Sequence, residues 1–234
     1  MTRFLANLLF IIIFNTGSVL LAAALVPTAF LSAEALRRGS RLWARYYLGC
    51  ARLILGVRVA VRGHVPQADA IVAFKHQSAF ETILTLALFE WPAVVMKAEL
   101  RRIPLWGLLA ARHGSIFVDR GSGGAALRAM VRQARARMAE HRPIVIFPEG
   151  TRIPYGETAP IRAGLYALAA ATRLPVVPVA LDAGRLWPRG LKPRRGTITL
   201  AFQPAIPAGL GREAFEARVV AAINADPVSV AVAA

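Results

Sequence analysis

The residue with the clearest chemical potential is His76, which lies in a short polar stretch of an otherwise apolar region. The ordinary pKa of histidine, about 6.5, lies near neutral pH, so His76 is a candidate general base. Glu81 follows five residues later. Its carboxylate could orient the imidazole and stabilise its cationic form, as the acid of a catalytic triad does. We therefore interpret His76 and Glu81 as a catalytic pair that removes a proton from a substrate.

The same residues also have a purely structural interpretation. Ser78 and Glu81 form a capping-box pattern, in which Glu81 would satisfy a backbone donor at the start of a helix. On one continuous helix, five residues turn by about 140°. His76 and Glu81 can therefore meet only if His76 lies on a loop and Glu81 in the first helical turn. The spacing alone leaves both interpretations open.

Further polar clusters follow three other short apolar runs of the chain. Arginine suits bidentate recognition of phosphate, lysine acts as a point charge, and a glycine lets backbone N–H groups approach an anion. Ligand sites of open α/β sheets lie beyond the carboxyl ends of the strands, so we expect one site at that edge. For each cation, the alternative is a solvated surface charge. The candidates are Lys97, Arg120, Gly150, Thr151 and Arg152.

Other kinds of chemistry find little support in the sequence. Ser78 lacks the Gly-x-Ser-x-Gly context of an exposed nucleophile. Cys50, the single cysteine of the chain, lies outside every polar cluster. The four histidines show no metal-ligand spacing and cannot be joined by a cysteine pair. We therefore predict no metal site.

The elements that must position these residues lie beyond residue 56. Short Val- and Ile-rich runs alternate there with helical patterns. This alternation predicts an α/β domain with a mixed, partly parallel sheet flanked by helices. We predict strands at 57–61, 70–74, 93–96, 115–118, 144–147, 176–181 and 197–202, and helices at 82–89, 125–140 and 163–172.

The N-terminal segment is long and apolar. No charged residue occurs from residue 4 to 33, and a helix of that length would run roughly 45 Å, against a hydrocarbon core of about 30 Å. We expect Pro27 to break the run and leave residues 4–26 as a membrane anchor. A cleaved signal peptide is the alternative, because the Ala-rich residues 21–25 could mimic a cleavage region. The apolar core of a signal peptide, however, is typically only about 7–15 residues.

A basic amphipathic segment follows at 40–55. At about 100° per residue, Arg41, Arg45 and Arg52 fall within an arc of roughly 40°. The segment could lie in the lipid headgroup layer, or it could pack its apolar face on the following domain. The arginines after the apolar run outnumber Arg3 before it, so the positive-inside bias places the bulk of the chain in the cytoplasm.

Composition narrows the class of partner. The net charge of +16 calls for a polyanion, and a hydrophobic fraction of 56% favours an anionic membrane surface over nucleic acid. We predict a membrane anchor with its basic segment at 1–56, an α/β domain at 57–227 and a frayed tail at 228–234.

Four motifs occur in order along the chain: His76-x4-Glu81, GSIFVDR from Gly114 to Arg120, FPEGTR from Phe147 to Arg152, and Val177-Pro178-Val179. Together they resemble the glycerolipid acyltransferases, and most closely the bacterial 1-acyl-glycerol-3-phosphate acyltransferases. A Lys-x-Glu-Leu element at 97–100 strengthens the resemblance, which covers about residues 70–205. The first motif of that family usually ends in Asp, whereas here it ends in Glu81, which is one methylene longer.

The resemblance implies that an acceptor hydroxyl attacks an acyl thioester without a covalent acyl-enzyme. His76 would deprotonate the hydroxyl of a lysophospholipid acceptor, and Glu81 would orient His76. Acyl-CoA or acyl carrier protein would be the co-substrate, with no cofactor, and the enzyme would lie on the cytoplasmic face of the inner membrane. Arg120 and Arg152 would hold the acceptor phosphate, and Lys97 would assist them. The pocket would be shaped by Glu149, Gly150 and Thr151. Pro178 would support the acyl channel.

Two alternatives to this function remain open. A related acyltransferase could use another lysolipid, such as a lyso-aminolipid, and its acceptor would then lack the phosphate. A basic protein without catalysis that binds membranes or nucleic acid is the other alternative. It leaves the clustering of polar residues after strands unexplained, and no nucleic-acid recognition motif is evident.

Overall fold

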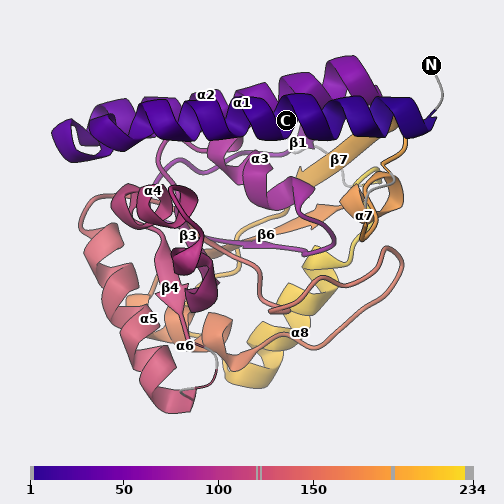
Figure 1. Ribbon diagram of the computed structural model, residues 1–234. Helices are drawn as coiled ribbons and strands as arrows, with labels where there is room; N and C mark the ends of the chain where they lie inside the picture. The colour runs from indigo at the N-terminus through magenta and orange to yellow at the C-terminus, as the bar shows by residue number, and fades with distance from the viewer. Residues whose placement is uncertain (1–2, 120, 122, 191–192, 230–234) are drawn as a thin grey trace.

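The computed structural model describes residues 3–119, 121, 123–190 and 193–229. Within these residues, seven strands form one sheet in the order β1-β7-β6-β2-β5-β3-β4 (Figure 1). Each predicted strand is present, and its ends lie within one residue of the prediction. The strands are β1 (Val57–Arg62), β2 (Ile71–Phe74), β3 (Ala93–Lys97), β4 (Ile116–Val118), β5 (Ile144–Ile146), β6 (Val176–Leu181) and β7 (Gly196–Phe202).

Five neighbouring strands run in one direction. β2 pairs in parallel with β5 and β6, and β3 pairs in parallel with β5 and β4. β6 and β7 are antiparallel, and β1 is parallel to β7. The predicted mixed, partly parallel sheet is therefore confirmed. Because the five strands share a direction, the polar segments that follow them all leave the sheet at the same edge.

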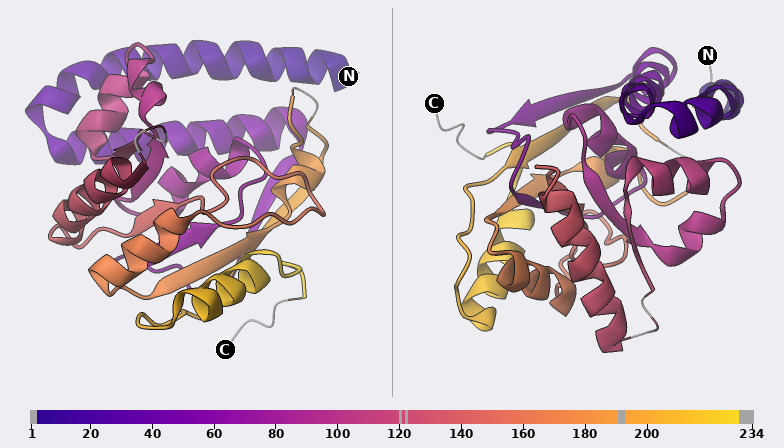
Figure 2. Two further views of the ribbon diagram at one scale, coloured as in Figure 1. Left: turned by 90° about the horizontal axis from the view of Figure 1, so that it is seen from below. Right: turned by 90° about the vertical axis from the view of Figure 1, so that its left-hand side faces the viewer.

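Helices cover both faces of the sheet (Figure 2). The three predicted helices are present as α3, α5 and α6, whereas α4, α7, α8 and the 3₁₀ helix η1 were not predicted. The helices are η1 (Ala98–Arg102), α3 (Phe80–Leu88), α4 (Trp106–His113), α5 (Gly123–Met138), α6 (Ala163–Thr172), α7 (Ala183–Leu186) and α8 (Arg212–Ile223).

Alternate residues of each central strand face opposite layers of the core. In β2, Val72 and Phe74 belong to the hydrophobic cluster under α2 and α3, while Ile71 and Ala73 belong to the cluster under α5, α6 and α8. All four side chains are fully buried. Burial on both faces explains why β2 reads as a continuous apolar run, as is usual for parallel strands covered by helices.

The N-terminal segment forms two helices, α1 (Arg3–Leu31) and α2 (Ala33–Leu55), which lie side by side across one end of the molecule (Figures 1 and 2). The expected break at Pro27 is wrong, because α1 continues through this residue to Leu31. Gly39 of α2 lacks a side chain where Leu25 of α1 packs. This close contact, two residues before Pro27, holds the helix despite the missing backbone donor of the proline.

α1 and α2 are also attached to the sheet domain. The rings of Phe10 and Trp187 meet edge to face at 5.5 Å between centroids, and Tyr47 of α2 contacts the ring of Phe80 at 5.6 Å. Tyr47, Cys50 and the rest of the buried face of α2 therefore pack on the domain, as the second interpretation of residues 40–55 expects. Arg45 and Arg52 remain exposed on the other side.

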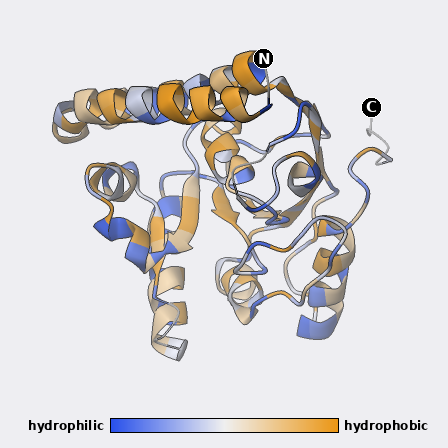
Figure 3. Ribbon diagram, turned by 45° about the vertical axis from the view of Figure 1, so that its right-hand side comes forward, coloured by the Kyte–Doolittle hydropathy of each residue, from blue (hydrophilic) through white to orange (hydrophobic). Residues whose placement is uncertain are grey.

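Among the described helices, α1 alone is long and apolar enough to cross a membrane by length and composition. Its apolar character is visible as an orange helix at the edge of the molecule in Figure 3. Large side chains such as Phe4, Ile12 and Leu20 are 77%, 55% and 66% exposed. An uncovered apolar surface of this size indicates membrane association.

The predicted domain boundary falls between α2, which ends at Leu55, and β1, which begins at Val57. Because both segments contribute to one hydrophobic cluster, the division of the chain into domains stays a prediction. Of the predicted frayed tail, residues 230–234 lie outside the described residues, while the backbone N–H groups of Val228 and Ser229 donate to Asp226.

Candidate active site

His76 lies on the loop between β2 and α3. The backbone N–H of Lys75 donates to Val179 O at 3.0 Å and closes the ladder between β2 and β6. The imidazole then lies on the ring of Phe147, the first residue after β5, with 4.5 Å between the ring centroids. The His76 side chain is 15% exposed. It is therefore held by the sheet edge and still open to a substrate.

The predicted pair of His76 and Glu81 is formed. His76 Nδ1 lies 2.9 Å from Glu81 Oε1, and the Glu81 side chain is fully buried. The carboxylate also accepts the backbone N–H groups of Gln77 and Ser78, both at 2.6 Å, and the hydroxyl of Ser78 at 2.7 Å. A carboxylate beside Nδ1 favours the tautomer with the proton on Nδ1, which leaves Nε2 as the basic nitrogen.

Glu81 makes its expected bond of the capping box, since it accepts the backbone N–H of Ser78, but the helix begins one residue later than that pattern requires. α3 begins at Phe80, and its N-cap is Ala79, which has no side-chain cap. Ser78 lies one residue earlier, where its hydroxyl accepts the backbone N–H of Phe80 at 3.0 Å. Glu81 satisfies backbone donors before the helix and contacts the imidazole at the same time. Both interpretations of Glu81 therefore apply to the same carboxylate.

The resemblance implies that Glu149 shapes the pocket, and in the structure its carboxylate also binds the residues around His76. Its Oε2 accepts the backbone N–H of His76 at 2.9 Å, and its Oε1 accepts Lys75 Nζ at 2.6 Å. Lys75 and Asn224, which contacts the same ammonium, were missed as site residues. A lysine directly before the histidine, at the end of a buried strand, was the signal in the sequence that could have identified Lys75.

The loop after β5 passes beside His76. Gly150 has a left-handed backbone with φ of 69°, a conformation that favours glycine, and its N–H donates to Phe147 O. The backbone N–H of Ile153 donates to His76 O at 2.7 Å. Thr151 and Arg152 are exposed on this loop. The segment that carries Arg152 is thus fixed next to the histidine.

Of the three other predicted site residues, the structure describes Lys97 and Pro178. Lys97 is exposed at the end of β3, and Arg120 lies outside the described residues. Pro178 is buried inside β6, opposite Ala73 of β2, and its carbonyl accepts the N–H of Gln203. The roles of these residues in binding phosphate or the acyl chain stay predictions.

α2 also contributes to the surroundings of the site. Burial, together with the negative charge of Glu81, raises the pKa of Tyr47 above its ordinary value. A tyrosine is neutral near pH 7 with its ordinary pKa, and here the phenol stays neutral to higher pH than usual. In the part of the chain that the structure describes, no group of three or more His, Cys, Asp or Glu residues could hold a metal ion.

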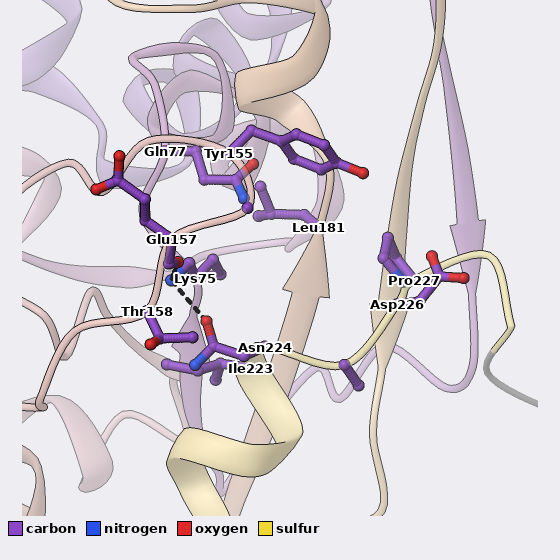
Figure 4. Close-up of a pocket in the computed structure, with 12 residues that line it drawn as sticks. Lys75, Gln77, Tyr155, Glu157, Thr158, Leu181, Ile223, Asn224, Asp226 and Pro227 are labelled. Carbon is purple, nitrogen blue, oxygen red and sulfur yellow. Dashed lines mark hydrogen bonds between the residues drawn. The ribbon is translucent and has the colours of Figure 1, made fainter.

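A small pocket of about 210 Å³ lies behind the histidine loop. Figure 4 shows Lys75, Gln77, Asn224 and Asp226 among the residues that line it, with Lys75 and Asn224 joined by a hydrogen bond. Both polar and apolar side chains line the pocket, so it is unlike an acyl chain site, which would be apolar.

A histidine–carboxylate pair at the carboxyl edge of a mixed sheet is suited to general-base catalysis, such as the activation of a hydroxyl for attack. The chain belongs to the Acyltransferase family, whose model matches residues 57–182. It is 35% identical over 167 residues to a 1-acyl-sn-glycerol-3-phosphate acyltransferase of Pseudomonas aeruginosa, a match that covers 70% of this chain and 65% of the relative. The human 1-acyl-sn-glycerol-3-phosphate acyltransferase alpha is 30% identical over 135 residues, which cover 56% of this chain and 48% of that protein.

The chain thus spans less than two thirds of the length of these curated relatives. A solved structure supports the fold over nearly the whole chain. The crystal structure of a 1-acyl-sn-glycerophosphate acyltransferase from Thermotoga maritima is similar with a TM-score of 0.76, at 22% identity and with 95% of each chain covered.

Proposed function

We propose that this protein transfers an acyl group from an acyl thioester to the free hydroxyl of 1-acyl-glycerol-3-phosphate, which gives phosphatidic acid for phospholipid synthesis. The observation that carries the proposal is the 2.9 Å contact between His76 Nδ1 and the buried carboxylate of Glu81. It lies within the segment matched by the family, and the relatives named above carry this activity in their names.

In the proposed reaction, His76 Nε2 takes the proton of the acceptor hydroxyl while the oxygen attacks the thioester carbonyl. The new C–O bond forms, the tetrahedral intermediate collapses, and the C–S bond breaks. The leaving thiolate takes the proton back from the imidazolium, so the products are phosphatidic acid and a free thiol. The charge of Glu81 stabilises the imidazolium between the two proton transfers.

The acceptor phosphate would be bound by the cations around this edge of the sheet. Arg152 is favoured because the next residue, Ile153, is hydrogen-bonded to the backbone of His76. A phosphate on the acceptor lies only a few bonds from its reacting hydroxyl, so its ligand must lie close to the base. We assign Arg120 and Lys97, which follow β4 and end β3, as further phosphate ligands.

The place of reaction would be the cytoplasmic face of the inner membrane. The exposed apolar side of α1 would insert into lipid, and the exposed Arg45 and Arg52 of α2 would contact anionic headgroups. The acceptor would then arrive from the bilayer and the thioester from water. Trypsin should cleave the chain in inverted membrane vesicles and spare it in intact spheroplasts. The opposite pattern would contradict this location.

The function is tested with purified protein in detergent and a labelled acyl donor, given either as acyl-CoA or as acyl carrier protein. The acceptors are 1-acyl-glycerol-3-phosphate, glycerol-3-phosphate, lysophosphatidylethanolamine and a lyso-aminolipid without phosphate. We expect label in phosphatidic acid. Label only in the acylated aminolipid would assign the protein to another lysolipid, and no labelled product with either donor would overturn the function.

A further inference from the structure

Lys75, the residue before His76, is a buried cation with a complete set of partners. Its side chain is 3% exposed. Its Nζ donates to Glu149 Oε1 at 2.6 Å, to Asn224 Oδ1 at 2.7 Å and to the backbone oxygen of Glu157 at 3.0 Å. The bond to Asn224 is drawn in Figure 4. A lysine ammonium has three N–H donors, so the protein itself occupies all of them.

This saturation decides what Lys75 can do. Although Lys75 lies at the wall of the small pocket, it has no donor left for an anion bound there. Its charge instead compensates the carboxylate of Glu149, whose side chain is fully buried. A buried carboxylate needs such a partner to stay ionised and fixed in place. Lys75 therefore holds Glu149.

Glu149 passes this constraint to the candidate base. While Oε1 binds Lys75, Oε2 accepts the backbone N–H of His76 at 2.9 Å. The main chain of His76 is thus held from one side by Glu149, just as its imidazole is held from the other by Glu81. The position of the His76 ring therefore depends on its contacts with both Glu149 and Glu81.

The far end of this connection lies in the last helix of the domain. Asn224 is the C-cap of α8, and its side chain also donates to Val220 O at 2.7 Å, which fixes the direction of the amide. α8 is anchored on the sheet through Phe215, Val219 and Ile223, each at most 1% exposed. The place of α8 therefore sets the place of the Asn224 oxygen.

We propose that Lys75, Glu149 and Asn224 are positioning residues, which tie α8 to the backbone of His76 and set the height of its imidazole against the acceptor hydroxyl. The inference rests on the proposed function, in which His76 is the base. None of the three touches the substrate in this scheme. They act through the main chain of His76, where a displacement of about 1 Å can cost about a hundredfold in rate.

The test uses Asn224, because Lys75→Met would leave the carboxylate of Glu149 buried without a partner and threaten folding. Asn224→Leu has a similar size and removes both side-chain bonds. Asn224→Asp keeps an acceptor oxygen for Lys75 and loses only the donor to Val220. The comparison of the two variants therefore isolates the link between residue 224 and Lys75.

We expect Asn224→Leu to lower kcat by about tenfold or more, because the base is displaced. KM for both substrates should change by less than about twofold, since no substrate contact is lost. Asn224→Asp should keep kcat within about threefold of the parent, because the charge-assisted bond survives. Met130→Ala is the matched control, since it creates a cavity at a buried position of α5 rather than α8 and should lower Tm without changing kcat of the folded protein.

A second readout needs no activity. Hydrogen exchange of the His76 amide, measured on peptides that begin at least three residues before His76, should speed up in Asn224→Leu and stay slow in Asn224→Asp and Met130→Ala. Equal exchange and equal kcat in both Asn224 variants, or a change in KM alone, would overturn the positioning role. If the parent protein transfers no acyl group while exchange follows the expected pattern, the proposed function fails and the structural link stands.

Discussion

β5 has a buried charge near each of its ends, and the two serve different purposes. Arg142 lies two residues before β5 and is 1% exposed, while Glu149 lies three residues after it and is 2% exposed. Both pair with an opposite charge, Arg142 with Glu140 and Glu149 with Lys75. By burial and pairing alone, neither end would be recognised as functional.

The difference lies in what the partners do. Arg142 donates to the backbone oxygens of Trp91, Pro92 and His113 and lies over the Trp91 ring at 4.2 Å, so its bonds join one loop to another. Glu149 holds the backbone of His76, whose ring is partly exposed. A buried charge therefore indicates a reactive site only where its bonds lead to an accessible titratable group.

The largest effect is expected at the His76 end of β5, where a substitution should remove most activity and leave stability nearly unchanged. His76→Ala should reduce acyl transfer about 10²–10⁴-fold, because a positioned general base contributes a factor of that size. Its unfolding free energy and membrane association should be close to those of the parent. Turnover is measured with acyl-CoA and 1-acyl-glycerol-3-phosphate, and near-normal turnover of folded His76→Ala would refute the mechanism.

Arg142→Met should do the reverse at the other end of β5. Removing one partner of a buried ion pair typically costs about 3–5 kcal/mol, and here three backbone oxygens also lose their donor. The measurement is urea unfolding in detergent, followed by circular dichroism. Turnover per folded molecule should change little. If Arg142→Met lowered the turnover per folded molecule as much as His76→Ala does, the two ends of β5 would be functionally alike.

Glu81→Gln separates charge from hydrogen bonding at the His76 end. Gln keeps one acceptor oxygen for His76 and the loop N–H groups, and the Ser78 hydroxyl can reverse its bond. Folding should therefore survive, while turnover falls by at least about a hundredfold because the imidazolium loses its counter-charge. Glu81→Asp should keep part of the activity. Stable and fully active Glu81→Gln would reduce Glu81 to a structural residue.

Arg152 offers an exposed counterpart to the buried Arg142. Arg152→Ala should raise KM for the lysophospholipid by about ten- to a hundredfold, since a charge-assisted bond to phosphate is worth roughly 1.5–3 kcal/mol. Arg152→Lys should recover only part of this, because the planar fork is lost. Steady-state kinetics with each substrate varied checks both. If only KM for the thioester changes, Arg152 binds the donor instead.

His113 gives the structural end its own pH dependence. Burial, followed by the nearby charge of Arg142, lowers the pKa of His113 to about 3. In the unfolded chain it binds a proton below about pH 6.5, so acid favours unfolding. Between pH 7 and 5 this should cost about 2 kcal/mol of stability at about 1.36 kcal/mol per pKa unit. Over this pH range the His113→Gln variant should lose about 2 kcal/mol less stability than the parent, as measured by urea unfolding at both pH values.

Much of the sheet could be predicted from the sequence, since each strand is a short apolar run bounded by Gly, Pro or charge. α8 was missed because its start carries no capping side chain at Gly211. Phe215, Val219 and Ile223 nevertheless have the four-residue spacing of a buried helix face. The break at Pro27 failed for a tertiary reason, since contacts with α2 hold α1 together.

The candidate site divides in the same way. The contact between His76 and Glu81 is local, so spacing and loop geometry could predict it. The links from Lys75 to Glu149 and to Asn224 span 74 and 149 residues. Such pairings depend on strand order and on where α8 packs, which no local pattern contains.

The two-sided packing of α1 has a practical consequence for protein engineering. Phe10 is 7% exposed and packs on Tyr47 and Trp187, so truncating the helix would uncover core side chains. Its outward side chains, such as Phe4 and Ile12, are exposed and are not part of this core packing. We therefore expect polar replacements at these outward positions, with Phe10 retained, to give a protein that needs no detergent and keeps the loop of His76 intact.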